Sequence, residues 1–208
     1  MQTRTIPVMA TAAIVAVGLG LGYVAVGPAG GAHPRARATL AGADGTKAGT
    51  VTFIDHDAHT EVRLQIKRVP AATTVRDAFH GFHIHANDDS LNGEGCVADP
   101  AAASSTWFVS ADGHWKAEGQ VHADHTGDMP SVLILPDGTA ELRFLTDRIA
   151  LDDLKGRAVV LHAGPDNFGN VPVGGAADQY TPNGAAALDK TQKTGNAGDR
   201  IACGVVRR

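Results

Sequence analysis

The chain is short of aromatic residues and of clustered positive charge, and each shortage excludes a class of protein. Phenylalanine, tryptophan and tyrosine together make up 5% of the 208 residues, whereas glycine occurs 25 times. This composition favours short strands joined by tight turns over a bundle of long helices. The formal net charge is −4, and no run of lysine and arginine occurs. Nucleic acid is therefore excluded as a partner, because phosphate binding requires a clustered basic face.

Charge is also missing from the N-terminal segment, between Arg4 and Arg35. Residues 6–26 form an uncharged, mostly apolar run, which is typical of a signal peptide with small residues for cleavage at 29–32 or at 36–38. The run is also long enough to span a bilayer, so an uncleaved membrane anchor is an alternative, and a buried core helix is a third. Under the first two interpretations the protein is exported, and is secreted, periplasmic or associated with the cell envelope.

Cysteine is scarce, since the chain contains only Cys96 and Cys203. Neither lies near the N-terminal segment, which argues against a lipid-anchored lipoprotein. Two cysteines outside the cytosol usually form a bridge, so export predicts a disulfide between them. The bridge would close a loop of more than about 100 residues, for which chain entropy gives a stabilisation of roughly 4–5 kcal/mol.

The rest of the chain has the pattern of a single β domain. Residues 1–37 comprise the export segment and a flexible tether rich in glycine, proline, alanine and arginine, so we expect one domain over residues 38–208. Within the domain, short apolar and β-branched runs bounded by turn-forming residues predict strands. They are a weak strand near 38–43 and strands at 51–54, 62–66, 81–85, 131–135, 139–144, 158–162 and 201–206.

Two long stretches between these strands, 87–129 and 163–199, are rich in glycine and show no regular pattern. Loops of this length inside a compact domain are usually functional or disordered. The predicted fold class is therefore all-β: an eight-stranded antiparallel Greek-key β-barrel or sandwich that carries two long functional loops.

Histidine is abundant, with ten residues. His33 lies in the tether, and His56 and His59 lie in a predicted hairpin turn, so we expect all three to be solvated. The other seven lie farther along the chain, at strand ends or in the first long stretch. Imidazoles that converge at a strand end form a good site for copper or zinc, and Asp128 adds an oxygen ligand that zinc accepts.

Spacing sorts these residues into two groups. His83 and His85 share one face of a strand, so both can reach one ion, and His162 ends another strand that needs only to lie alongside. The second group consists of residues spaced three apart: His122, His125 and Asp128. A tight turn could place all three around another ion. His114 lies between the groups. Spacing alone supports one or two metal sites, but it identifies neither the metal, nor a shared ligand, nor a reaction.

Two segments resemble known sequence motifs. Residues 81–85 (Gly-Phe-His-Ile-His) and 195–205 (Gly-Asn-Ala-Gly-Asp-Arg-Ile-Ala-Cys-Gly-Val) resemble the two signature segments of the copper–zinc superoxide dismutase family, in the same order and at a similar separation. The resemblance covers nearly everything from about residue 38 to the C-terminus, and the second segment is highly specific. It implies the β-sandwich architecture of that family.

The resemblance also implies roles for individual residues. It implies four copper ligands, His83, His85, His114 and His162. It also implies four zinc ligands, His114, His122, His125 and Asp128, with the His114 ring bridging the two ions as an imidazolate. Asp166 resembles the carboxylate that orients one copper-binding and one zinc-binding histidine. Arg200 resembles the arginine that guides the anion to copper, and Cys96 and Cys203 match the family's disulfide.

One departure from the family pattern concerns zinc. Only two residues separate His122 from His125, whereas most family members have a longer excursion there, and some bacterial relatives with a shortened loop keep copper alone. Because all four zinc-ligand types are present in this chain, we expect zinc as well as copper. Asp124 is a substitute ligand if His122 does not reach the ion.

The resemblance implies the reaction 2 O₂⁻ + 2 H⁺ → O₂ + H₂O₂, with superoxide as substrate, Cu(II)/Cu(I) cycling, and protection against superoxide outside the cytoplasm. His114 would return a proton to the product. Because the chain is net negative, local positive charge must attract the anion; Arg200 is the candidate, and Lys190 and Lys193 could assist. A domain that stores or transfers copper and a structural or adhesive β-sandwich are the alternatives. The complete copper set together with Arg200 favours the enzyme.

Overall fold

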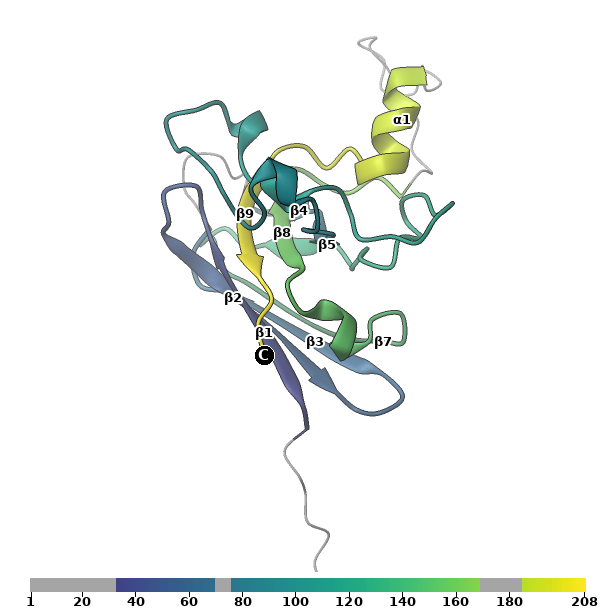
Figure 1. The fold of residues 1–208 in the computed structure, drawn as a ribbon. Coiled ribbons are helices and arrows are strands. Elements are labelled where there is room, and N and C mark those ends of the chain that lie inside the picture. Colours follow the sequence, from purple (N-terminus) through teal and green to yellow (C-terminus); the bar gives the residue numbers. More distant parts are fainter. Residues whose placement is uncertain (1–32, 70–75, 169–184) are drawn as a thin grey trace, which may run out of the picture. The chain divides into compact units, whose positions relative to one another are not determined.

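Nine strands run through residues 33–69, 76–168 and 185–208, the part of the chain that the computed structural model describes (Figure 1). They are β1 (Arg35–Ala41), β2 (Lys47–Asp55), β3 (Thr60–Ile66), β4 (Ala78–His80), β5 (Phe82–His85), β6 (Val132–Ile134), β7 (Ala140–Thr146), β8 (Ala158–His162) and β9 (Arg200–Val205). The helical elements are α1 (Ala185–Thr194) and the short 3₁₀ helices η1 (Ser90–Asn92), η2 (Ser104–Thr106), η3 (Val109–Ala111) and η4 (Leu151–Leu154). The all-β prediction is confirmed.

The expected export segment, residues 6–26, lies outside the described residues. Among those that are described, no helix has the length and apolar character needed to cross a membrane. The compact unit begins at His33 and extends to the C-terminus.

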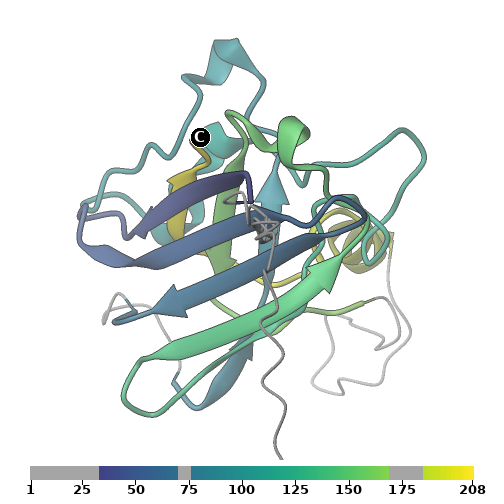
Figure 2. The same cartoon turned by 90° about the horizontal axis from the view of Figure 1, so that it is seen from below.

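Seven of the strands form one antiparallel sheet in the order β5-β8-β9-β1-β2-β3-β7, and β4 pairs with β6 in a small second sheet. Three neighbouring pairs in the large sheet, β5–β8, β9–β1 and β3–β7, join segments that are far apart in sequence. Such crossovers between antiparallel strands are of the Greek-key kind that we expected. Seen from below, the large sheet curls around its inner face (Figure 2).

The first strand starts earlier than the sequence indicated. β1 begins at Arg35, three residues before the predicted domain start at residue 38, and the alternative cleavage region at 36–38 lies inside it. Its residues alternate between exposed and buried, with Ala36 and Ala38 on the buried face. Alanine contributes little to a hydropathy pattern, so the sequence alone does not reveal a strand at these residues and assigns them to the tether.

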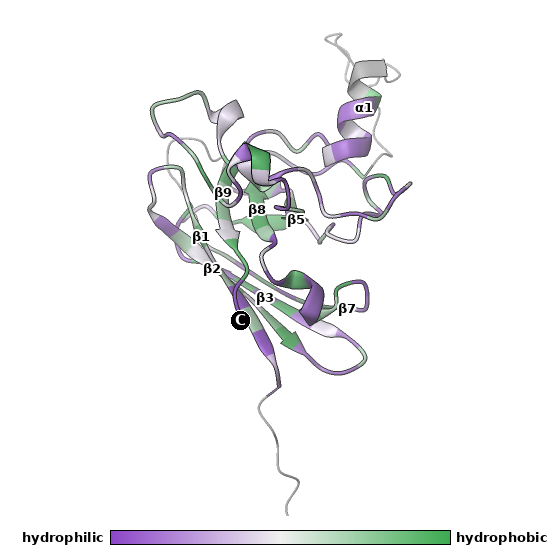
Figure 3. Ribbon diagram, in the orientation of Figure 1, coloured by the Kyte–Doolittle hydropathy of each residue, from purple (hydrophilic) through white to green (hydrophobic). Residues whose placement is uncertain are grey.

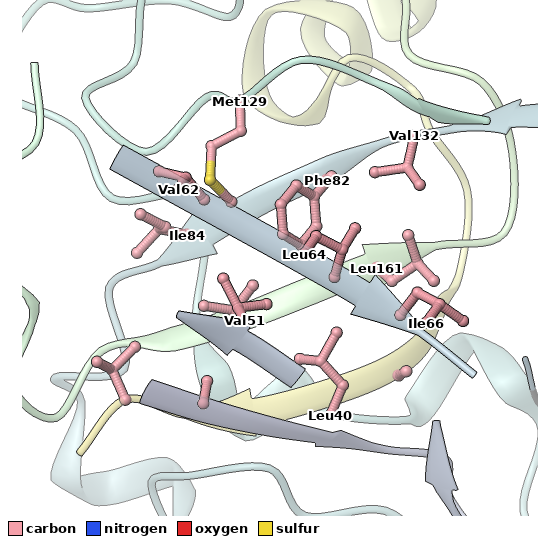
Figure 4. Close-up of a cluster of buried hydrophobic side chains, with 14 of the residues drawn as sticks. Leu40, Val51, Val62, Leu64, Ile66, Phe82, Ile84, Met129, Val132 and Leu161 are labelled. Atoms are coloured by element: carbon pink, nitrogen blue, oxygen red, sulfur yellow. The ribbon is translucent and has the colours of Figure 1, made fainter. Parts of the chain in front are cut away.

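The core lies on the inner face of the sheets (Figures 3 and 4). Side chains of β2 and β3 meet those of β5 and β8 across it, and Phe53, Phe82, Ile84 and Leu161 are completely buried. Burying a side chain of this size stabilises the fold by about 1.5–3 kcal/mol. The packing therefore fixes the position of β5 and β8, the strands that carry His83, His85 and His162.

The strand predicted at 81–85 corresponds to β5, and an additional strand, β4, precedes it. Gly81 lies between the two, where the chain passes from the small sheet to the large one. Gly81 N donates to Gly164 O over 2.9 Å, and Gly81 O accepts from His162 N over 2.9 Å. A Cβ at this position would lie 2.7 Å from the Cβ of Ala197, so the close approach requires glycine. The chain before Gly81 forms β4 and the chain after it forms β5, which gives nine strands where eight were predicted.

The second long stretch contains a helix that the sequence analysis did not predict. α1 follows residues 169–184, which lie outside the described residues, and it includes Leu188, Lys190 and Lys193, all exposed. Alanine, leucine, lysine and glutamine favour helix, but a weakly amphipathic segment of ten residues gives a poor periodic signal. The first long stretch lies at the same end of the sheets as α1 (Figure 1).

A disulfide ties the first long stretch to the sheet. Cys96 is bonded to Cys203 of β9, with 5.5 Å between the Cα atoms and a sequence separation of 107. We expect Cys96→Ala/Cys203→Ala to lower the free energy of unfolding by about 2–5 kcal/mol, because a long loop is no longer closed in the unfolded chain. Urea unfolding measures the change. Wild-type protein held in dithiothreitol should unfold at the same urea concentration as the variant; an unchanged midpoint in both would contradict the prediction.

Candidate metal centre

Six histidines and two aspartates from four separate parts of the chain converge in one buried cluster. Its members are His83, His85, His114, His122, His125, His162, Asp128 and Asp166. The six histidines are at most 5% exposed. The structure thus brings together every ligand position that the resemblance implied, whereas Asp124, the substitute ligand, is exposed and belongs to neither candidate metal-binding group.

The sheet sets the spacing of the cluster. β5 and β8 are antiparallel partners in which Phe82 faces Leu161, so His83 and His85 lie next to the end of β8, where His162 stands. The first long stretch folds back over β5 through isolated bridges that pair His83 with Asp128 and His85 with His114. Strand pairing therefore places residues that are up to about 80 positions apart within reach of one ion.

Four imidazoles form the first metal-binding group: His83, His85, His114 and His162. One nitrogen from each lies within 4.8 Å of the others. The rings of His83 and His114 are 4.0 Å apart at their centroids, and the Nε2 atoms of His85 and His162 are separated by 3.4 Å.

Hydrogen bonds at the outer nitrogens fix which nitrogen of each ring faces the group. His85 Nδ1 donates to Asp112 O over 2.8 Å, and His162 Nδ1 donates to Gly198 O over 3.1 Å. A carbonyl only accepts, so in the neutral rings the proton is on Nδ1 and the lone pair is on Nε2. His83 is bonded the other way round, since its Nε2 donates to Asp166 over 2.8 Å. The remaining nitrogens all point at one place.

Burial keeps the first group neutral. It lowers the pKa of His83 and His85 well below the ordinary value, and the neighbouring His114 lowers both further. Burial and His114 likewise lower the pKa of His162 to about 3. These rings are neutral at pH 7, and the neutral imidazole is the form that binds a metal ion.

A second group surrounds Asp128. Ligand atoms of His114, His122 and Asp128 lie within 4.8 Å of one another, in a set that also includes His83, and His125 stands beside this set. His114 Nδ1 is 2.9 Å from Asp128 Oδ1, and His122 Nδ1 is 3.0 Å from Asp128 Oδ2. His125 Nδ1 lies 3.2 Å from His114 Nδ1 and 3.4 Å from the same carboxylate. His122 reaches the group despite the two-residue spacing to His125. His114 belongs to both groups, with Nδ1 facing the second and Nε2 facing the first.

Charge in the second group is concentrated on Asp128 and His122. Burial opposes ionisation of Asp128, but hydrogen bonds with His114 and His122 outweigh it and hold the pKa of the carboxyl below its usual range. Burial also lowers the pKa of His122, yet Asp128 and Asp166 raise it to about 9. An ion that binds His122 must therefore displace a proton, so binding becomes more favourable as the pH rises towards 9.

Asp166 links the two groups. Its side chain is fully buried and contacts His83 Nε2 at 2.8 Å and His122 Nε2 at 2.9 Å. Gly195 permits this arrangement, because a Cβ there would collide with both Asp166 Oδ1 and His122 Nε2. The backbone of α1 holds the short turn in place, with His122 N donating to Gln192 O over 2.8 Å.

The donor set fits metal ions of the copper and zinc type. Among the described residues, His83 Nδ1 and His114 Nε2 are buried and have no hydrogen-bond partner. Each such group costs about 1–3 kcal/mol unless something satisfies it, and a bound ion does so. Four imidazoles suit copper or zinc, and three imidazoles with one carboxylate suit zinc.

Asp166→Asn is expected to weaken divalent metal binding by about 10–100-fold, the usual effect of removing an outer hydrogen bond to a metal-binding histidine. The amide keeps the volume of the carboxylate but cannot accept a hydrogen bond from both His83 and His122. Dialysis of Zn(II) against a competing chelator measures the change. Asp124→Asn is the matched control, because that carboxylate is exposed and outside both groups; equal weakening in the two variants would contradict the role of Asp166.

Arg200 stands beside the first group, at the start of β9. Its guanidinium donates to the carbonyls of Phe108 and Asp112, and its charge lowers the pKa of both His85 and His162. The Asp112 carbonyl therefore holds Arg200 and His85 at once. Of the two lysines on α1, Lys193 is paired with Asp189 at 3.0 Å and Lys190 is exposed.

Two residues near the centre received no role in the sequence analysis. His80 is completely buried, and its Nδ1 donates to His162 O over 2.9 Å, so it braces the backbone of a metal-site residue. Asp112 accepts at its side chain from the backbone nitrogens of Asp88 and Asp89, which orders the chain beyond β5. The only sequence signal for Asp112 is its place two residues before His114, in an Asp-Gly pair.

Comparisons with known proteins bear on the same region. A sequence model of the family described as copper/zinc superoxide dismutase (SODC) matches residues 47–206. The chain is 33% identical over 192 residues to a Cu-Zn superoxide dismutase of Mycolicibacterium paratuberculosis, covering 90% of this chain and 79% of that one. It is 35% identical over 173 residues to the corresponding protein of Mycobacterium bovis, covering 81% of this chain and 68% of that one.

Similarity extends to a solved structure. The crystal structure of the clock protein EA4 superposes with a TM-score of 0.57 and 27% identity, covering 84% of this chain and 94% of that chain. The matching family segment includes all the residues of the cluster described above.

Proposed function

Since the chain belongs to the copper/zinc superoxide dismutase family, we propose that one copper ion and one zinc ion bind in the buried cluster and support its activity. The protein is an enzyme, a superoxide dismutase. The proposed copper ligands are the first group, His83, His85, His114 and His162. The proposed zinc ligands are His114, His122, His125 and Asp128.

The observation that carries this proposal is the position of His114. Its Nε2 is buried among the rings of the first group and has no hydrogen-bond partner in the part of the chain that the structure describes, while its Nδ1 lies 2.9 Å from Asp128 in the second. One imidazole thus presents opposite nitrogens to two sets of donors. An arrangement of this kind is suited to a ring that is shared between two ions.

When bound, copper supplies one-electron chemistry between Cu(II) and Cu(I). The protein's own residues bring in the substrate and the proton. Arg200 offers a fixed positive charge to the superoxide anion, because two backbone carbonyls hold its guanidinium. When its Nε2 is not bound to copper, His114 would hold a proton there and give it to the peroxide product, and solvent would supply the second proton. Two superoxide ions and two protons are consumed for each O₂ and H₂O₂ formed.

We also propose that the enzyme acts outside the cytoplasm. The apolar run at residues 6–26 supports export, either as a cleaved signal or as a membrane anchor. The Cys96–Cys203 disulfide supports the same location, because such bonds persist in oxidising compartments.

Metal analysis combined with a dismutase assay tests the proposed metal content. Protein reconstituted with both metals should hold one copper and one zinc per chain, and dismutation should require the copper. Protein loaded with zinc alone should be inactive. Copper bound without dismutation would instead identify a copper-handling domain, and failure to retain zinc would show that the short turn between His122 and His125 excludes it.

A further inference from the structure

The three histidines outside the metal centre lie against one another on the surface. The ring centroid of His56 is 4.5 Å from that of His33 and 5.4 Å from that of His59. His33 is exposed, and the other two are half-buried. The sequence analysis expected three separately solvated side chains; the structure gathers them into one group, which we name the surface histidine cluster.

Backbone pairing holds the cluster together. His56 N donates to His59 O over 2.9 Å across the β2–β3 turn, which places the two rings on the same side. Asp55 N donates to Pro34 O over 3.0 Å, and β1 continues from there paired with β2, with Arg35 opposite Ile54. His33 is therefore held beside the turn by the register of two strands.

A carboxylate orients the central ring. His56 Nε2 lies 3.1 Å from Glu61 Oε2, and Glu61 is buried and held ionised by hydrogen bonds from Arg63 and Arg143, which lower its pKa. An ionised carboxylate only accepts, so neutral His56 carries its proton on Nε2 and its lone pair on Nδ1. Metal-binding histidines usually have such a hydrogen bond at the nitrogen that does not bind the ion.

The surroundings attract a cation. His59 lines a cavity of about 180 Å³ whose wall includes four carboxylates, those of Asp55, Asp57, Asp147 and Asp152. Arg208 pairs with Asp152, and Arg63 and Arg143 are engaged by Glu61. Among the described residues, the other three aspartates form no ion pair, and their negative charge beside His59 raises the local concentration of positive ions.

From these observations we propose that His33, His56 and His59 form a surface site for a divalent transition-metal ion, with Cu(II) bound most strongly. Three imidazoles suit copper, nickel and zinc, and Cu(II) heads the general affinity order for nitrogen ligands. All ten histidines of the chain lie in the described residues and the other seven are buried, so these three are the histidines open to an ion from solvent.

The three surface rings must turn about their side-chain bonds to converge on one ion, whereas the ligand atoms of the first buried group already lie within 4.8 Å of one another. The surface site therefore binds a metal ion more weakly than the buried centre does, and it takes up metal only after the buried centre is filled.

The test uses the full chain with one copper and one zinc already bound, as verified by elemental analysis. Equilibrium dialysis against Cu(II) in the presence of a weak competing chelator should show one additional copper per chain. Its electron paramagnetic resonance difference spectrum should carry hyperfine splitting from nitrogen. His56→Asn/His59→Asn should weaken binding of the additional copper at least about tenfold, and His33→Asn should weaken it less.

Two readouts separate this site from the buried centre. Dismutase activity and the first two metal equivalents should be unchanged in all these variants. Gln65→Asn is the matched control, because it introduces asparagine at an exposed position of β3 outside the cluster and leaves the charge of the chain unchanged, and it should retain the additional copper. Absence of additional copper in the wild-type chain, or equally tight binding by the double variant, would overturn the proposal.

Discussion

His162→Ala should reduce dismutation to the background of the assay and abolish stoichiometric copper uptake. The ring is 2% exposed, and its Nε2 lies 3.4 Å from that of His85, where a shared ion would bind. Alanine leaves three imidazoles and a space that water can enter in place of the fourth. Loss of an outer hydrogen bond costs about 10–100-fold in metal affinity, so the loss of a ligand should cost more.

Copper content and kcat measured on the same preparation check this prediction. Val160→Ala is the matched control, because it removes buried side-chain volume from the same strand without removing a donor. The control should lower the unfolding midpoint while keeping copper and activity. Near-normal activity in His162→Ala would mean that the proposed copper ligands are wrong.

Strands that alternate apolar and polar residues were predictable from the sequence. Those at 51–54, 62–66 and 139–144 correspond to β2, β3 and β7. The passage between the two sheets at Gly81 was not predictable, because it depends on hydrogen bonds with Gly164 and His162, which are distant in sequence and leave no local pattern. Helix α1 was missed for a related reason, since a short helix in a loop is stabilised by what it packs against more than by its own periodicity.

The residues of the candidate metal centre were predictable as a set, but their arrangement was not. Spacing grouped His83 with His85 and left open whether any ligand is shared. The answer depends on which nitrogen of each ring faces inward, and carbonyls at Asp112 and Gly198 decide that for His85 and His162. The surface histidine cluster was missed because it arises from the register of β1 on β2, which brings His33 to a turn more than about 20 residues away.

Arg200→Glu should lower kcat/KM by about 10–10³-fold, the range over which electrostatic steering changes association rates. The formal charge of the chain is −4, so the average field repels superoxide and a local positive charge must overcome it. In the wild type, added salt should slow the reaction by screening this attraction, since the Debye length is about 10 Å at 0.1 M ionic strength. In the variant the salt dependence should weaken or reverse.

Charge and position must be separated to interpret that result, because the Asp112 carbonyl that holds Arg200 also holds His85. Copper content should be measured in each variant, and we expect it to be unchanged in Arg200→Glu. Arg200→Lys should recover part of kcat/KM, because lysine restores the positive charge but not the hydrogen bonds to both carbonyls. Arg37→Glu, at an exposed position of β1, makes the same change in net charge and should leave kcat/KM nearly unchanged. Equal losses in the two glutamate variants would show that net charge alone acts. Unchanged kinetics of Arg200→Glu at low ionic strength would remove the steering role, because screening is then weakest and the field of one residue extends farthest.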